Sequence, residues 1–445
     1  MNYISQNQKD KCDMLKVIGV NSVNELFDMI PNSLKVKKLN IYGEKTEQEL
    51  LNYFANIALK NKIFVSFRGA GIYDHYIPSL VDEVIGRSEF LTAYTPYQAE
   101  ASQGTLQTIF EYQSLICSLT GLDVSNASLY DGATAVAEAA LLSLKVNSKK
   151  NTILISQALH PEYIQTIRTY LENSRAKIIM LDISLDGSIK ESSVEAAVNN
   201  NDIAAAIIQS PNYFGIIENM QALSCVIKKS GALFIAVVNP ISLGVFQAPG
   251  EYNADIAVGE GQVLGSPMSF GGTTLGFMVV KKSLEWKMPG RIVGQTTDKN
   301  GKRGFVLTLQ SREQHIRRER ATSNICTNAS LNALAACVFL SGWGNHGFKN
   351  LAETNMSKAK YAFNKIKSLN GFKAKFKDAV FFNEFVIETK KNIKMINKIL
   401  LKNSILGPLD LSGTSEFFKN CILFCVTEQR TKCEIDRCIK ILSEI

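Results

Sequence analysis

Between about residue 127 and residue 280, short apolar runs alternate with stretches in which apolar residues recur at helical spacing. The runs predict strands at 152–155, 177–181, 203–209, 232–238, 255–258 and 275–280. The stretches between most of them predict helices near 133–146, 161–173, 190–199 and 219–229. This alternation indicates right-handed crossovers and a mostly parallel sheet with helices on both faces. We therefore predict an α/β fold for this part of the chain.

The two ends of the chain have other patterns. Residues 1–60 predict helices, one of which begins after Ser22 with Glu25 at its third position, as in a capping box. A long helix is predicted around 311–342. Beyond it we predict helices at 349–368, 391–402 and 431–444 and strands at 371–376, 380–388 and 420–427.

These patterns divide the chain into three predicted parts. They are an N-terminal helical segment (1–60), a large α/β domain (61–328) and a small C-terminal α+β domain (329–445). A large α/β domain followed by a small α+β domain is the layout of the aspartate-aminotransferase-like (fold-type I) enzymes, which use pyridoxal phosphate. The layout alone does not assign a function, because many α/β enzymes carry such an appendage.

Composition and charge limit the classes of function. Of the 445 residues, 46% are apolar and 20% are charged, as in ordinary globular proteins. The chain has no run of about eighteen apolar residues and no signal-peptide core, so we expect a cytoplasmic protein with no membrane partner. The net charge of +8 comes from scattered basic residues. Because these form no tracts, nucleic acid is not an expected partner.

The cysteines and histidines do not predict a metal site. The nine cysteines are an odd number with irregular spacing, and the chain has only four histidines. A metal centre would need paired short spacings with histidines beside them. We therefore predict no metal and expect the cysteines to be reduced, buried thiols.

Residues 94–104, with the sequence YTPYQAEASQG, are the most unusual stretch of the chain. Two Tyr hydroxyls, two Gln amides, a Thr, a Ser and a carboxylate gather just before an apolar helix. A core segment does not tolerate so many polar groups without partners, and a surface loop has no need of paired aromatic side chains. We predict that this segment lines a pocket or an interface.

A fold-type I enzyme needs three groups for pyridoxal phosphate: a helix N-terminus for the phosphate, a carboxylate for the pyridine nitrogen and a lysine for the Schiff base. Residues 128–135 offer a strand-to-helix turn, but Asp131 would place a negative charge beside the phosphate, and it could equally cap the helix. The neutral Asn239 stands where the carboxylate is expected. No lysine occurs from 230 to 280. We expect that this chain alone does not hold the cofactor covalently.

Other polar segments leave their roles open. Residues 311–320 carry mixed charges at a predicted helix start, with Glu313 four positions before Arg317. The segment is either a solvated face with internal ion pairs or a surface for an anion or an acidic partner. His75 and His160 lie next to turns, where a structural role is the simpler interpretation for each alone.

Seven motifs together carry a resemblance to a known family. They are residues 69–75 (GAGIYDH), 94–104, 126–134 (NASLYDGAT), 259–262 (GEGQ), 269–272 (SFGG), 312–319 (REQHIRRE) and 322–327 (TSNICT). On these motifs the chain resembles the glycine decarboxylase family, the P-proteins of the glycine cleavage system, and within it the first subunit of the two-subunit form. Two departures are Arg68, where an aliphatic residue is expected, and Asn239, where an Asp is often seen.

The resemblance implies an enzyme subunit, glycine dehydrogenase (aminomethyl-transferring, decarboxylating). With a lysine-bearing second subunit that binds pyridoxal phosphate, it would decarboxylate glycine and pass the aminomethyl group to the lipoyl group of H-protein. An α2β2 assembly is implied. Two alternatives remain open: a non-catalytic scaffold that stabilises the partner, and a self-sufficient fold-type I decarboxylase or aminotransferase.

The resemblance also implies which residues act. This chain would complete the shared site by hydrogen bonds to glycine or the cofactor, with His75 as a weaker candidate for proton or substrate handling. The residues expected at the shared site are Tyr94, Thr95, Tyr97, Gln98, Ser102 and Gln103. The residues expected to contact the partner or an anion are Arg312, His315, Arg317 and Arg318.

Overall fold

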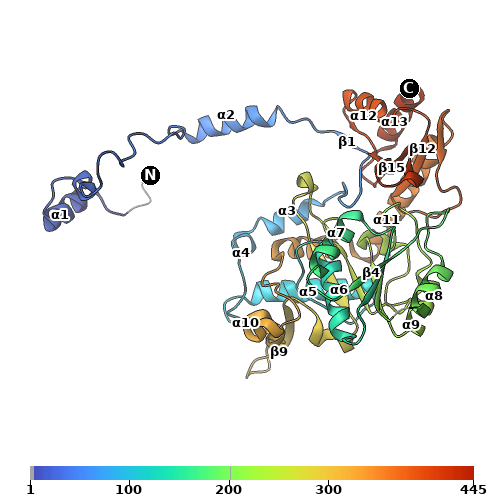
Figure 1. The fold of residues 1–445 in the computed structure, drawn as a ribbon. Coiled ribbons are helices and arrows are strands. Elements are labelled where there is room, and N and C mark those ends of the chain that lie inside the picture. The colour runs from blue at the N-terminus through green and yellow to red at the C-terminus, as the bar shows by residue number, and fades with distance from the viewer. Residues whose placement is uncertain (1–4, 201) are drawn as a thin grey trace. The chain divides into compact units, whose positions relative to one another are not determined.

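The computed structural model describes residues 5–200 and 202–445 (Figure 1). The chain separates into two compact units, of which the first ends at Lys62 and the second is Ile63–Ile445. The predicted boundary between a large and a small domain at 328/329 falls inside the second unit and stays a prediction.

The first unit consists of short helices and connecting loops. They are α1 (Gln8–Ile18), the 3-10 helix η1 (Val23–Phe27) and α2 (Glu47–Ala58). Capping boxes begin both α-helices, through Asn7 and Asp10 in α1 and through Thr46 and Glu49 in α2. The capping box predicted at Ser22 is wrong, because the Ser22 side chain bonds no backbone N–H of η1.

A seven-stranded sheet forms the centre of the second unit, in the order β2-β8-β7-β6-β5-β3-β4. Every neighbouring pair from β7 to β4 is parallel, and only β8 runs antiparallel to β7 and β2. The predicted mostly parallel sheet is therefore confirmed. The strands are β2 (Val124–Ser125), β3 (Thr152–Ser156), β4 (Lys177–Leu181), β5 (Ile203–Gln209), β6 (Leu233–Val237), β7 (Ile256–Glu260) and β8 (Gly276–Val280).

Alternate residues of each strand build two separate cores, because successive side chains point to opposite faces of a sheet. In β6, Phe234 and Ala236 join the core of one face, whereas Ile235 and Val237 join the core of the other. Helices therefore cover both faces (Figure 1). They are α5 (Gln103–Thr120), α6 (Gly132–Val146), α7 (Pro161–Leu171), α8 (Glu191–Asn200) and α9 (Met220–Lys229).

The C-terminal part carries a second, antiparallel sheet in the order β11-β12-β15-β14. Its phenylalanines and the helices above it form a further core. Its elements are β11 (Phe372–Ala374), β12 (Glu384–Thr389), α12 (Ile393–Lys402), β13 (Ile405–Leu406), β14 (Leu409–Asp410), η7 (Glu416–Phe418), β15 (Cys421–Cys425) and α13 (Lys432–Ser443). The short strand β1 (Val65–Ser66) pairs with β13 in parallel. This pairing brings the start of the second unit against the C-terminal part.

The long helix predicted around 311–342 is wrong. Short helices replace its first half: η5 (Gln310–Arg312), α10 (Gln314–Arg317) and η6 (Arg318–Arg320). Arg318 has a φ of 53°, which breaks helical geometry there. The long helix is instead α11 (Ser330–Ile366), interrupted only at Gly344.

The remaining elements connect these layers. The hairpin of β9 (Ile292–Thr297) and β10 (Arg303–Thr308) packs against α5. The others are α3 (Ser79–Ile85), α4 (Ser88–Leu91), η2 (Pro240–Gly244), η3 (Ser269–Gly271) and η4 (Lys282–Lys287).

All nine cysteines are free thiols, as expected, but only Cys337, Cys421, Cys425 and Cys438 are buried. Their predicted burial is therefore wrong for the others. Within the described ranges, no three His, Cys, Asp or Glu side chains are grouped so that they could hold a metal ion. No helix among the same residues has both the length and the apolar character needed to cross a bilayer.

Candidate functional site

Ligands of parallel α/β proteins bind at the carboxyl ends of the strands, and there the start of α6 faces the end of β7. The Asp131 side chain accepts a hydrogen bond from the Thr134 N–H at 2.7 Å, and Thr134 bonds back to the Asp131 N–H. Asp131 is therefore the N-cap of α6. Its carboxylate already interacts favourably with the positive end of the helix dipole.

A second carboxylate, that of Glu260 at the end of β7, occupies the same place. It accepts hydrogen bonds from three backbone N–H groups, those of Gly132 (2.9 Å), Gln262 (2.9 Å) and Leu275 (2.8 Å). Burial raises the pKa of Glu260, and the three N–H donors oppose that shift. The backbone donors that could hold a phosphate are thus used by a side chain of the protein itself.

Pyridoxal phosphate does not fit this position. The cavity beside Glu260 has a volume of about 30 Å³, room for about two water molecules. His160 lines it, with its ring centroid 4.9 Å from that of Tyr163 and 5.0 Å from that of Tyr213. Asn239 bonds the Ile241 N–H and caps η2. Two carboxylates, a small cavity and the lysine-free stretch therefore all disagree with a bound cofactor.

The motif 69–75 covers the cofactor position at the start of α6 and connects it to the C-terminal part. Gln262 bonds both the N–H and the carbonyl of Tyr73, each at 3.1 Å. Glu384 of β12 accepts from the Ala70 N–H and from the Tyr73 hydroxyl, each at 2.7 Å. Complete burial raises the pKa of Glu384 to about 7. The motifs 69–75, 126–134 and 259–262 thus meet in one hydrogen-bonded cluster.

His160 has the structural role that its turn position suggested. Its Nδ1 accepts a hydrogen bond from the Glu162 N–H and its Nε2 lies 2.9 Å from the Ala70 carbonyl oxygen. Burial lowers the pKa of His160. Both contacts suit a neutral ring with the proton on Nε2.

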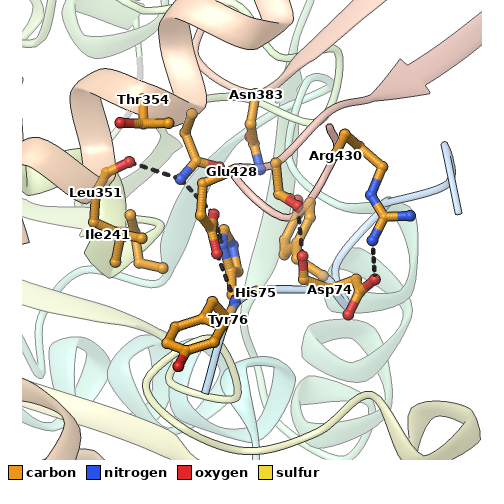
Figure 2. Close-up of polar contacts among 12 residues, drawn as sticks. Asp74, His75, Tyr76, Ile241, Leu351, Thr354, Asn383, Glu428 and Arg430 are labelled. Carbon is orange, nitrogen blue, oxygen red and sulfur yellow. Dashed lines mark hydrogen bonds and ion pairs between the residues drawn. The ribbon is translucent and has the colours of Figure 1, made fainter. Parts of the chain in front are cut away.

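His75 lies in a buried polar cluster that joins the loop after β1 to the C-terminal part (Figure 2). Its Nδ1 is 2.8 Å from Glu428, which also accepts from the Tyr76 N–H (2.6 Å) and from Asn355 (2.7 Å). Burial opposes ionisation of Glu428, but His75 and the Tyr76 N–H lower its pKa. Arg430 pairs with Asp74 at 2.6 Å. The His75 side chain is only 2% exposed, so its ring is enclosed by the protein.

The segment 94–103 is anchored at its end and exposed at its centre. Gln103 bonds the N–H and the carbonyl of Phe305 in β10, each at 2.8 Å. The Tyr97 hydroxyl accepts from Arg291 at 3.3 Å, and the guanidinium lies 5.4 Å from the ring centroid. Tyr94 is 79% and Tyr97 64% exposed, and Gln98 is also exposed. Thr95 and Ser102 are partly buried, and no side-chain bond from Ser102 caps α5.

The basic residues of 312–318 fall into two groups. Arg312 is buried and donates to the carbonyls of Met288, Gly290 and Leu309. Its guanidinium therefore supports the chain rather than facing a partner. His315, Arg317 and Arg318 are exposed, and His315 lies 3.7 Å from Glu313. The expected helical pair of Glu313 and Arg317 is replaced by this contact.

The two predicted groups of site residues are linked through the loop before β9. Arg291 contacts Tyr97, and the neighbouring Gly290 accepts from Arg312, so the loop before β9 joins the two segments. The β9–β10 hairpin that follows this loop also packs against α5. We call the exposed side chains of 94–98 and 315–318 the open face.

Sequence reasoning missed the carboxylates that organise the interior. Glu260, Glu384 and Glu428 each end or begin a buried strand region, and no charge pattern marks them. Glu138, on the buried side of α6, was also missed. Burial raises its pKa to about 7, and Ser323 donates to it at 2.9 Å. For Glu138 and Glu384 the signal is a single acidic residue in a largely apolar stretch, and Glu260 stands in the motif 259–262. The sequence around Glu428 gives no such signal.

The architecture defines a class of protein, the fold-type I enzymes that use pyridoxal phosphate. Glutamate decarboxylase of Lactobacillus brevis shares this fold, with 11% identity, a TM-score of 0.68 and coverage of 95% of this chain and 96% of that chain. A sphingosine-1-phosphate lyase of Burkholderia pseudomallei has 13% identity and a TM-score of 0.65, with coverage of 93% and 94%. At these identities the likeness shows the fold alone.

Nearer relatives identify the family. The family model of the glycine cleavage system P-protein matches residues 1–442. The "Probable glycine dehydrogenase (decarboxylating) subunit 1" of Endomicrobium trichonymphae is 74% identical over 444 residues, covering 100% of both chains. The protein of that name in Anoxybacillus flavithermus is 48% identical over 446 residues, covering 99% and 98%. A crystal structure of glycine decarboxylase (P-protein) in inhibitor-bound form has 36% identity and a TM-score of 0.87, with full coverage of both chains.

This chain belongs to the glycine cleavage system P-protein family. The resemblance of the seven motifs is thereby confirmed, and the enzyme class is that of glycine dehydrogenase (decarboxylating) subunits. The name "subunit 1" of its relatives implies a second subunit.

Proposed function

We propose that this chain is the first of two subunits of a glycine dehydrogenase (decarboxylating), and that the second subunit alone holds pyridoxal phosphate. One observation carries this proposal: the chain's own cofactor position is closed by the Glu260 carboxylate on the backbone donors of α6. No lysine stands between 230 and 280 to hold the cofactor there. The family's chemistry therefore needs a cofactor site on another chain.

In this proposal the open face completes the site of the second subunit. Tyr94, Tyr97 and Gln98 are exposed, and they orient glycine or the cofactor by hydrogen bonds across the interface. Gln103 and Arg291 hold the segment on the β9–β10 hairpin, so these groups meet the partner already positioned. Pre-positioned polar groups stabilise a reacting substrate without reorganisation. Thr95 and Ser102, which are partly buried, support the same segment.

The remaining candidates have lesser roles. His315, Arg317 and Arg318 contact acidic groups of the partner at the edge of the open face. We limit His75 to positioning the motif 69–75, because its side chain is enclosed and bonded to Glu428.

The complete reaction includes partners beyond the second subunit. We propose that the aminomethyl group passes to the lipoyl group of H-protein, that the two subunits form an α2β2 assembly, and that the enzyme works in the cytoplasm. These steps rest on membership of the P-protein family.

Reconstitution tests the proposal. Purified alone and dialysed, the chain is expected to show no visible absorbance from bound pyridoxal phosphate and no glycine–bicarbonate exchange. Exchange should appear when the second subunit is added. Borohydride reduction and peptide mapping of the active complex should place the pyridoxyl group on the second subunit. A pyridoxyl-lysine in this chain would instead identify it as a self-sufficient enzyme.

A further inference from the structure

The carboxyl end of the parallel sheet holds a second cavity besides the one at Glu260. It lies where Ser210 follows β5 and Val238 follows β6, and the start of α9 and η2 complete its lining. Its volume is about 170 Å³, against about 30 Å³ for the cavity beside Glu260. This volume has room for about ten water molecules. None of its described lining residues belongs to the seven family motifs, so those motifs assign the cavity no role.

Most of the lining is apolar. The apolar side chains that line the cavity are all buried or partly buried: Pro211, Ile217, Met220, Val238, Leu243 and Phe246. The exposed lining residues are all amides: Asn219, Gln221 and Gln247. Because exposed residues mark where solvent reaches the cavity, these amides form its mouth. An apolar cavity with a few polar groups is the usual form of a small-molecule site.

One buried polar group in the lining lacks a partner. Tyr252 is 3% exposed, and its ring centroid lies 6.0 Å from that of Phe234. No residue among those described forms a hydrogen bond with the Tyr252 hydroxyl. Buried hydroxyls are normally hydrogen-bonded, because an unpaired one has lost its contacts with water. Burial raises the pKa of Tyr252, so the hydroxyl stays protonated and can donate to a ligand in the cavity.

Glu218 sets the charge of the cavity. Its side chain is buried, and its two oxygens accept from the Ile189 N–H and the Asn212 amide, each at 2.8 Å. Burial raises the pKa of Glu218 to about 7, so the carboxyl is partly ionised near neutral pH. Among the described residues, no lysine, arginine or histidine lines the cavity. An anion would therefore have no counter-charge, and a cation would find both Glu218 oxygens already bonded.

We propose that this cavity binds a small uncharged molecule with a compact apolar body and an oxygen acceptor, such as an aliphatic amide or alcohol. The apolar body packs against Met220, Leu243 and Phe246, and the oxygen accepts a hydrogen bond from the Tyr252 hydroxyl. The ligand enters past the exposed amides at the mouth. This binding involves neither the cofactor position nor the open face, so it is independent of the proposed two-subunit enzyme.

Three probes of similar branched shape test the site on the full-length chain. They are isobutyramide, isobutyrate and isobutylamine, which are uncharged, negative and positive at neutral pH. Isobutyramide is expected to bind with a dissociation constant on the order of 1 mM, a strength that so small a ligand can reach. The two charged probes should bind at least about tenfold more weakly, because the cavity compensates neither charge. Saturation-transfer NMR, with each probe titrated into the chain, measures the constants.

Two matched variants locate the binding. Tyr252→Phe removes only the hydroxyl, and the dissociation constant of isobutyramide should rise by about tenfold. The control is Tyr112→Phe, which should leave the constant unchanged. Tyr112 is also buried and its hydroxyl also has no partner, but it does not line the cavity. In crystals of the wild-type chain soaked with isobutyramide, the probe oxygen should lie within hydrogen-bond distance of the Tyr252 hydroxyl.

The opposite results overturn the proposal, and each leaves the two-subunit enzyme intact. No saturation transfer to isobutyramide, or equal constants for Tyr252→Phe and the wild type, would show that the cavity does not bind it. Isobutyrate bound as tightly as isobutyramide would contradict an uncharged ligand. Isobutylamine bound more tightly, with this binding lost in Glu218→Gln, would assign the cavity to a cation. A probe found only outside the cavity in the soaked crystals would be an adventitious additive only.

Discussion

The cofactor position at the start of α6 and the open face of 94–98 and 315–318 are both built from family motifs, yet they use their polar groups in opposite ways. Around Glu260, carboxylates and amides bond other parts of the same chain. On the open face, Tyr94, Tyr97 and Gln98 extend into solvent. Family motifs of this chain therefore form an internal support in one place and an exposed polar surface in the other.

The difference follows from where the backbone donors are used. A helix N-terminus at the edge of a parallel sheet attracts an anion, because its N–H groups are unpaired and its dipole is positive. In this chain Asp131 and Glu260 supply that anion from within. The interior is thereby satisfied without a ligand, whereas the polar side chains of the open face remain exposed to solvent.

Glu260→Ala should have the largest effect on the closed position. It leaves three buried N–H groups without an acceptor, and we expect a loss of about 3 kcal/mol in the free energy of unfolding. Urea titration measures the loss. Glu260→Gln keeps one acceptor oxygen in place and should lose clearly less. An unchanged midpoint for the alanine variant would contradict the closing role of Glu260.

Glu260→Ala should also change how the closed position responds to anions. Without the Glu260 carboxylate, the donors at the start of α6 are free to bind an external anion. Inorganic phosphate is therefore expected to raise the melting temperature of Glu260→Ala but not that of the wild type. Equal shifts in both proteins would mean that phosphate acts elsewhere.

Glu384 should make the free energy of unfolding depend on pH. Burial raises its pKa to about 7 from 4.5, so the folded chain holds this proton more tightly than the unfolded chain. Stability is therefore lost as the pH rises from about 4.5 to about 7, by about 3 kcal/mol in total. Glu384→Gln does not ionise, so its stability relative to the wild type should increase over this window. A stability difference between Glu384→Gln and the wild type that is the same at every pH would contradict the raised pKa of Glu384.

Arg312 and Arg317 belong to the same motif, but Arg312 is buried and supports the fold, whereas Arg317 is exposed. Arg312→Ala removes the donors to three carbonyls and should cost about 2 kcal/mol of stability in the lone chain. Arg317 is exposed, so Arg317→Ala should stay within about 0.5 kcal/mol. Thermal unfolding of both variants measures the contrast. Equal losses would place Arg317 in the interior framework too.

Tyr97→Phe with Gln98→Ala should have the smallest effect on the lone chain and a clear one on the enzyme. The only bond lost within the chain is the 3.3 Å contact with Arg291, so stability should change by less than about 1 kcal/mol. Glycine–bicarbonate exchange of the reconstituted complex should fall by about tenfold or more. Gln107→Ala is the control, because this partly buried side chain on α5 bonds only Glu111 of the same helix. Full activity of the double variant would favour a non-catalytic scaffold.

Periodicity was sufficient for most of the second unit. The strands β4 and β5 have the predicted bounds, and β3, β6, β7 and β8 differ by one or two residues at their ends. In the C-terminal part, β12 begins four residues after its predicted start, and the β9–β10 hairpin was not predicted. Two-sided burial makes these strands continuously apolar, which is the signal that a sequence shows most clearly. The prediction failed at 311–329, where charged residues in helical order do not form a long helix. There Arg312 bonds distant carbonyls and Arg318 has a positive φ.

The sequence by itself determined the fold class, the family and the absence of a lysine for the cofactor, because apolar periodicity and motif residues are local properties of the chain. Only the tertiary structure decided that Asp131 is a cap, that Glu260 fills the phosphate position and that His75 is enclosed. It also separated the buried Arg312 from the exposed Arg317. These outcomes depend on which distant backbone groups each side chain meets, and hydrogen bonds between residues more than a hundred positions apart leave no pattern in the sequence.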